Sequence, residues 1–190
     1  MKTPAFSNKA THSFGVILAA VLLAGCLMSE YDEYHIIINT DGKSGTITTT
    51  MYNLESDQSD TVKQREDFET LLQNWKGDQY LLEKMKEGVY VKDRKLTAEK
   101  GGLVWKEVAI FADIPQLFHD VIVNDTLRIG FGNDETVVAT NGELIRTKDS
   151  SFVQWPLQAK EFFLKTKKND FHATSNFAAK FKAYIKDHHE

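Results

Sequence analysis

Alternation of apolar and polar residues predicts a β-hairpin near the start of the main domain. Two runs rich in β-branched residues, 34–39 and 46–52, flank a short turn with Asp41-Gly42 at its centre. Asp-Gly between two such runs is a strong signal for a hairpin turn. We expect alternate residues of the first run to face the core, and the threonine-rich second run to have one face in water.

After residue 60 the period changes from two residues to 3.6, which predicts two helices. The segment 61–64 resembles a capping box, and Gly77 is expected to stop the first helix. A second, shorter helix over 79–87 is expected to be opened by Asp78 and closed by Gly88. The apolar stripe of the first helix is formed by Phe68, Leu71, Leu72 and Trp75.

Strand patterns dominate the rest of the chain. Asn141-Gly142 is its strongest turn signal and predicts a hairpin between 136–140 and 143–147, whereas Trp155-Pro156 is expected to end a loop. A short helix is predicted from Asp113 and a last helix over 176–186. Another predicted strand begins at residue 89. Three more are predicted over 103–112, 127–131 and 161–166. The fold class is therefore α+β: a mostly antiparallel sheet of seven or eight strands, a helical hairpin insertion and a C-terminal helix.

Length and composition fit a single globular domain. The chain has 190 residues, of which 42% are hydrophobic and 26% are charged. A single cysteine excludes a disulfide scaffold and a cysteine-based zinc module. The net charge of −4 gives no electrostatic signature of nucleic-acid binding, so we expect no nucleic-acid partner.

The first 25 residues differ from everything that follows. Lys2 and Lys9 make a weakly basic start, no acidic residue precedes Glu30, and an apolar run covers 14–24. A membrane-spanning helix needs about 20 apolar residues, so this run is too short to span, but it suits a signal peptide. The apolar run ends at the only cysteine, Cys26.

Leu23-Ala24-Gly25-Cys26 resembles the lipobox of bacterial lipoproteins. The resemblance implies cleavage between Gly25 and Cys26, a diacylglyceryl group on the Cys26 thiol, and acylation of the new amino group with a fatty acid such as palmitate. Two or three acyl chains anchor a protein stably. Leu27, in place of the aspartate that marks inner-membrane retention, favours the outer membrane if the host is Gram-negative. The alternative is an uncleaved anchor or a buried cysteine after an ordinary signal.

These features divide the chain into three parts. We expect a signal peptide over 1–25, a short lipidated tether over 26–32 and a single α+β domain over 33–190. Because the tether is only a few residues long, the domain should lie close to the bilayer of the cell envelope.

A wider resemblance rests on turn motifs. Asp41-Gly42, Ser44-Gly45 and the stretch from Gly101-Gly102 to 114 are similar to uncharacterised envelope lipoproteins and, distantly, to the mycobacterial LppM-type ectodomain. That family is associated with lipid or glycolipid binding, so the resemblance implies a lipid ligand, without identifying binding residues.

Candidate chemistry is sparse. No catalytic, metal or cofactor motif is present, and the histidines lack metal-type spacing. The C-terminal pair His188-His189 fits a solvated helix end better than a loose metal site. The densest basic patch has two interpretations, a solvated strand edge or contact with anionic lipid headgroups; it comprises Lys160, Lys165, Lys167 and Lys168.

Three hypotheses for function follow. The first is a non-enzymatic, lipid-anchored module that binds a lipid or an envelope protein. The second is a carrier of lipids or amphiphiles, with an apolar pocket lined by Trp105, Phe111 and Phe131. The third is an enzyme without a local sequence signature, which would need polar groups that converge in a cleft.

Overall fold

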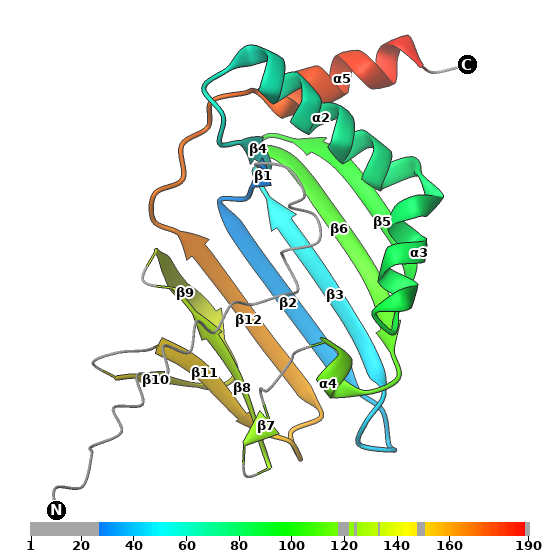
Figure 1. Ribbon diagram of the computed structural model, residues 1–190. Helices are drawn as coiled ribbons and strands as arrows, with labels where there is room; N and C mark the ends of the chain where they lie inside the picture. Colours follow the sequence, from blue (N-terminus) through cyan, green and yellow to red (C-terminus); the bar gives the residue numbers. More distant parts are fainter. Residues whose placement is uncertain (1–26, 118–121, 124, 133, 148–150, 189–190) are drawn as a thin grey trace, which may run out of the picture.

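The computed structural model describes residues 27–117, 122–123, 125–132, 134–147 and 151–188. The predicted signal peptide, Cys26 and His189 lie outside these residues. The main element is a six-stranded sheet with the order β5-β6-β3-β2-β12-β9 (Figure 1). Its strands are β2 (Tyr31–Ile38), β3 (Gly45–Tyr52), β5 (Val89–Glu99), β6 (Gly102–Phe111), β9 (Glu135–Thr140) and β12 (Glu161–Lys168).

The predicted first hairpin is confirmed and forms the centre of this sheet. Strands β2 and β3 pair in antiparallel fashion from Tyr31↔Tyr52 to Ile38↔Gly45. A second sheet has the order β10-β11-β8-β7, and β1 pairs with β4 in a two-stranded sheet. These strands are β1 (Leu27–Met28), β4 (Glu55–Ser56), β7 (Ile122–Val123), β8 (Thr126–Phe131), β10 (Glu143–Arg146) and β11 (Ser151–Pro156).

The predicted helical hairpin and C-terminal helix are also confirmed. The helices are α2 (Thr61–Lys76), α3 (Asp78–Lys86), α4 (Ile114–Leu117) and α5 (Phe177–Asp187). With mostly antiparallel strands, these elements give the expected α+β class, although the strands are divided among three sheets and exceed the predicted seven or eight.

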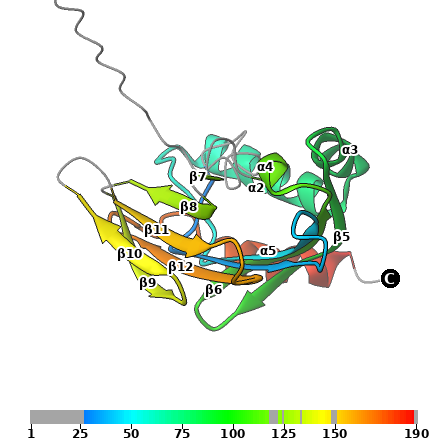
Figure 2. The same cartoon turned by 90° about the horizontal axis from the view of Figure 1, so that it is seen from below.

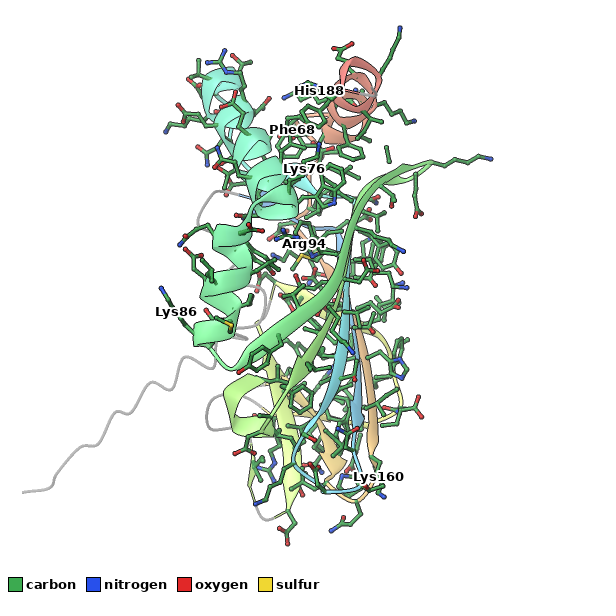
Figure 3. All side chains as sticks on the ribbon, turned by 90° about the vertical axis from the view of Figure 1, so that its right-hand side faces the viewer. Phe68, Lys76, Lys86, Arg94, Lys160 and His188 are labelled. Atoms are coloured by element: carbon green, nitrogen blue, oxygen red, sulfur yellow. The ribbon has the colours of Figure 1, made fainter. Side chains whose placement is uncertain are left out.

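The main sheet is covered on one side. Helices α2, α3 and α4 and the four-stranded sheet lie over one face, which we call the covered face (Figure 2). None of the described helices or strands lies over the opposite face, which we call the open face (Figures 2 and 3). Helix α5 packs beside β5 and β6 at one end of the sheet.

The covered face carries two apolar clusters. The first lies between the two larger sheets and includes Ile36, Phe162 and Trp155. The second lies under α2 and α5, where Phe68 meets Phe177 at 5.2 Å and Trp75 meets Phe181 at 5.3 Å between ring centroids. Because the sequence places these rings at helical spacing, the two helices share one core.

The caps of the helical hairpin differ from the prediction. Asp60, one residue before the predicted box, is the N-cap of α2, and its carboxylate accepts hydrogen bonds from the backbone of Val62 and Lys63. Asp78 is the first residue of α3, whose N-cap Gly77 makes no side-chain bond. Aspartate accepts backbone N–H groups at a helix start as well as serine or threonine does, which explains the shift by one residue.

The prediction of a hairpin at Asn141-Gly142 is wrong. Strand β9 belongs to the six-stranded sheet and β10 to the four-stranded sheet, so the chain turns a corner between layers here. Asn141 Oδ1 accepts hydrogen bonds from Trp155 Nε1 at 2.7 Å and from the backbone N of Phe163 at 2.8 Å. A Cβ at Gly142 would lie 2.5 Å from the Trp155 ring, so glycine is required for close packing rather than for a turn.

The expected loop ending at Trp155-Pro156 is instead strand β11. It pairs with both β8 and β10, and its alternate residues Val153 and Trp155 are buried. Pro156 stands at the end of the strand, where a missing N–H is tolerated.

Helix α5 is held by a buried carboxylate from β4. Glu55 accepts hydrogen bonds from the backbone N of Ser175 at 2.9 Å and of Phe177 at 3.3 Å, and from the Ser175 hydroxyl. These N–H groups stand at the start of α5, where a helix favours negative charge. Glu55 therefore links β4, the strand that precedes α2, to the start of the C-terminal helix α5.

The predicted tether over 26–32 does not match the fold. Leu27 is buried in the second cluster and pairs with Ser56, Ser29 and Asp32 are buried, and β2 begins at Tyr31. The folded domain therefore includes residue 27, the first residue after the predicted lipidation site.

Candidate functional site

A buried polar cluster lies on the covered face beneath α3. Glu107 on β6 and Lys84 on α3 are only 8% and 4% exposed. The hydroxyl of Tyr80, one helical turn before Lys84, donates a hydrogen bond of 2.7 Å to Glu107 Oε2. The two α3 side chains therefore approach the same carboxylate of the sheet.

The cations of this cluster also have structural partners. Lys84 Nζ lies 3.2 Å from Glu87 Oε2 at the end of α3. Arg94 donates hydrogen bonds to the carbonyl oxygens of Asn74, at 2.6 Å, and Gly77, at 2.9 Å. Figure 3 shows Arg94 between the helices and the sheet. Arg94 thus satisfies carbonyl groups at the C-terminus of α2.

Burial dominates the electrostatics of the cluster. It raises the pKa of Glu107, while the Tyr80 hydroxyl and the charges of Lys84 and Arg94 oppose this rise. Burial and the neighbouring Glu107 also raise the pKa of Tyr80 far above its ordinary range, so Tyr80 stays a hydrogen-bond donor. Chemically, the cluster holds a carboxyl group that binds a proton more readily than an exposed glutamate.

A small cavity adjoins this carboxyl group. Its volume is about 20 Å³, and it is lined by Ile47, Thr49, Met51, Tyr80, Lys84, Val89, Trp105 and Glu107. Trp105 is fully buried, and its Nε1 has no hydrogen-bond partner within the described part of the chain. A volume of this size holds about one water molecule, whereas pockets for drug-sized ligands measure roughly 300–1,000 Å³. This cavity is too small for an acyl chain.

Of the three predicted pocket residues, Trp105 lines this small cavity, whereas Phe111 and Phe131 do not. Trp105 belongs to the cluster under α2 and α5. Phe111, on the same strand, belongs to the cluster between the sheets, and Phe131 packs against that cluster from β8. Trp105 and Phe111 are buried core residues, so the aromatic rings fill the interior.

The open face carries a row of exposed apolar side chains. Strand register places Ile37, Ile110 and Tyr90 in one row across the sheet, with Thr46 of β3 at its centre. Their exposed fractions are 47%, 37% and 48%. Three large apolar side chains in register on a face without a covering layer suggest a contact surface.

A second row of the open face is charged. The register Lys165–Glu33–Thr50–Lys106–Lys95 runs from β12 to β5. Lys165 Nζ lies 3.0 Å from Glu33 Oε2 and also over the ring of Tyr52, 4.4 Å from its centroid. Lys106 is exposed and has no ion-pair partner among the described residues.

The structure places the basic patch differently from one of its two interpretations. The strand-edge interpretation is wrong, because β12 lies between β2 and β9. Lys165 and Lys167 are on the open face, where Glu33 and Glu30 pair with them at 3.0 and 3.3 Å. Contact with anionic headgroups remains an untested prediction, and these ion pairs partly neutralise the two lysines.

His35 and His188 have ordinary surface partners. His35 Nε2 lies 2.8 Å from Glu161 Oε1 on the open face, and His188 stacks on Tyr184 with 4.1 Å between ring centroids. Over the described ranges, no group of three or more His, Cys, Asp or Glu residues is placed to hold a metal ion. No helix in these same ranges combines the length and apolar character needed to cross a bilayer.

Sequence reasoning missed the polar cluster, although a signal was present. Leu103, Trp105, Ala109 and Phe111 all face the core from β6, and Glu107 stands at the one charged position of the same series. A charged residue in an otherwise apolar inward series indicates a buried, partnered charge. The partners themselves, from α3 and β5, depend on tertiary packing.

Comparison of the chain with protein-family models, with curated proteins and with solved structures found no match.

Proposed function

We propose that this protein is a lipid-anchored module of the bacterial cell envelope that acts by binding rather than by catalysis. The observation that carries the proposal is the motif Leu23-Ala24-Gly25-Cys26 at the end of a short apolar run. In the proposed mature form the Cys26 thiol carries the lipid, and the outer membrane is the favoured location in a Gram-negative host.

The start of the domain supports this arrangement. Leu27 is 4% exposed and pairs with Ser56, so one peptide bond separates the proposed anchor from the folded core. A domain attached in this way stays against the bilayer with a restricted set of orientations. A binding surface on such a domain faces partners in or near the same membrane.

Exposed side chains of the structure support a binding role. Exposed apolar residues lie in register on the open face, whereas the cations beside Glu107 are engaged in fixing α2 and α3. The cavity beside Trp105, about 20 Å³ in volume, is itself too small for an acyl chain. These observations support an interaction surface on the open face.

Intact-mass analysis of protein from its native host, together with membrane fractionation, tests the anchor. The wild-type chain should lack residues 1–25, carry added acyl mass and sediment with membranes. The Cys26→Ser variant should lack the added acyl mass and should not be processed as a lipoprotein, because serine has no thiol to accept the diacylglyceryl group. Gly25→Ala is the matched control and should behave as wild type, since it keeps a small residue before the cysteine. An unmodified Cys26 in native protein would contradict the proposal.

A further inference from the structure

We propose that the cavity beneath α3 binds one ordered water molecule, which accepts hydrogen bonds from Trp105 Nε1 and Lys84 Nζ and donates one to the carboxylate of Glu107. This water site joins α3 to β6 inside the domain. The inference goes beyond the proposed function, because it concerns the interior of the covered face and neither the lipid anchor nor the open face. The two proposals therefore succeed or fail separately.

The first argument is the size of the cavity and the burial of its walls. The volume is about 20 Å³, and about 10–15 Å³ is enough for one water molecule. None of the residues that line the cavity is more than 8% exposed. The volume therefore selects a very small polar ligand, which buried side chains surround.

The second argument is an indole N–H group that lacks an acceptor. Trp105 is fully buried and lines the cavity, and its Nε1 has no hydrogen-bond partner among the described residues. Buried polar groups are almost always paired, because an unpaired group loses its hydration without compensation. Trp155 shows the usual arrangement, since its Nε1 donates to Asn141 Oδ1 at 2.7 Å. Trp105 therefore requires an acceptor, and a water oxygen in the cavity supplies one.

The third argument is a pair of opposite charges that no direct ion pair joins. Lys84 and Glu107 are 4% and 8% exposed and line the same cavity. Within the described ranges, Lys84 pairs with Glu87, and the hydrogen bond that Glu107 accepts comes from Tyr80. An ammonium group has three donors and a carboxylate has about four acceptor positions, so both keep capacity for another partner. A water molecule between them can accept from Lys84 and donate to Glu107.

The mixture of donors and acceptors identifies the ligand as water. Trp105 and Lys84 offer only donors, so a metal cation would gain no ligand from the indole and would be repelled by the ammonium group. A chloride ion would be repelled by the carboxylate of Glu107. Water both accepts and donates, and buried waters typically make about three hydrogen bonds. Trp105, Lys84 and Glu107 provide these three.

The water site also accounts for how α3 is attached to the sheet. The buried residues of this helix are Tyr80 and Lys84, both polar, whereas Leu82 and Met85 are 46% and 47% exposed. Polar contacts therefore contribute to the packing of this helix on β6. Tyr80 reaches Glu107 directly, and Lys84 reaches β6 through the water.

NMR of the full chain in detergent micelles, with isotope-labelled indole nitrogens, tests the site. Trp75→Phe and Trp155→Phe assign the three indole signals by elimination. The Trp105 N–H should show a water cross-peak of opposite sign in NOE and ROE spectra, which identifies a bound water molecule rather than passing solvent. Trp155 is the matched control and should show none, because it is almost equally buried and its N–H donates to Asn141.

A pair of lysine variants tests the bridge. Lys84→Met removes one donor and should reduce the Trp105 cross-peak by about threefold or more, because each partner lengthens the residence of a buried water. Lys86→Met changes an exposed lysine of the same helix and should leave the cross-peak unchanged. An unchanged Trp155 signal shows that each variant is folded.

A crystal structure that resolves ordered water gives an independent measurement. The hydroxyl protons of Tyr80 and Thr49, which also line the cavity, exchange with solvent and can imitate a water contact in NMR but not in electron density. One water should lie about 2.7–3.2 Å from both Trp105 Nε1 and a carboxylate oxygen of Glu107.

Three results would overturn the inference. One is a Trp105 N–H without a water cross-peak of opposite sign in the two spectra. Another is a Lys84→Met variant whose cross-peak is as strong as that of Lys86→Met. The third is electron density that leaves the cavity empty or fills it with an ion.

Discussion

Glu107 is a charged residue at an inward-facing position of β6 and is 8% exposed. Its neighbours on the inward side of β6 are Trp105 and Ala109, both buried apolar residues. An ionised carboxylate in such a place needs partners, and Tyr80 and Lys84 of α3 supply them. The carboxyl group therefore ties the position of α3 to the protonation state of one residue.

The pH dependence of stability follows from the raised pKa of Glu107. The folded state binds this proton more tightly than the unfolded state, so the stabilising contribution is present at low pH and is lost as the pH rises through the folded-state pKa. Glu107→Gln keeps an acceptor for Tyr80 but cannot ionise. We expect it to unfold at a higher urea concentration than wild type at pH 8, with the difference shrinking as the pH approaches 4.5, the ordinary glutamate value.

Glu66→Gln is the control for this measurement, because Glu66 is exposed on α2. It should leave the difference from wild type small at every pH. If Glu107→Gln were less stable than wild type at pH 8, the charges of Lys84 and Arg94 would outweigh burial, and our assignment of the dominant effect would be wrong.

At the scale of elements, the corner at Asn141 joins the two larger sheets. One side chain satisfies Trp155 Nε1 from β11 and the backbone of Phe163 from β12, and its amide also donates to the carbonyl of Glu161. These partners belong to different layers. The residue that signals a turn in the sequence therefore fixes how one sheet packs on the other.

Replacing Asn141 should loosen this packing. Asn141→Ala leaves Trp155 Nε1 and the Phe163 N–H without their acceptor, and we expect a loss of about 2–3 kcal/mol in the free energy of unfolding. Asn141→Asp keeps a side-chain oxygen that can accept both hydrogen bonds and should cost less. Urea unfolding followed by tryptophan fluorescence measures both, and equal losses would show that the acceptor role is minor.

The elements that the sequence predicted well are those with local causes. The first hairpin has Asp41-Gly42 between alternating strands, and α2 and α3 follow helical periodicity. Strand β11 and the corner at Asn141 could not be found in the same way, because their pairing partners β8 and β10 are chosen by packing between distant segments. The same limit applies to the cluster around Glu107, since its partners come from two other elements, α3 and β5.

At the scale of the whole molecule, the folded domain already includes its first described residue, Leu27. Leu27 belongs to the cluster shared with Phe177 and Trp105. Its partner strand β4 also carries Glu55, which holds the start of α5. The two ends of the domain are therefore stabilised at one place.

A residue of a flexible tether and a residue of the core respond differently when the side chain is replaced by that of alanine. Because Leu27 is buried, Leu27→Ala should lower the free energy of unfolding by about 2–4 kcal/mol. Met28→Ala, at the neighbouring half-buried position, should cost under about 1 kcal/mol. Urea unfolding in a Cys26→Ser background separates this effect from lipid attachment. Equal small losses would restore the view of this segment as a linker.

If Cys26 carries the proposed lipid, the burial of Leu27 also limits where the protein can act. With an acyl group on Cys26, no flexible linker would let the domain move away from the membrane surface. The surface of the domain then stays within about one domain diameter of the bilayer. The molecules that it contacts must therefore diffuse in the same leaflet or extend to the membrane surface. Such a domain is suited to lateral encounters among neighbours rather than to bridging the gap between two membranes.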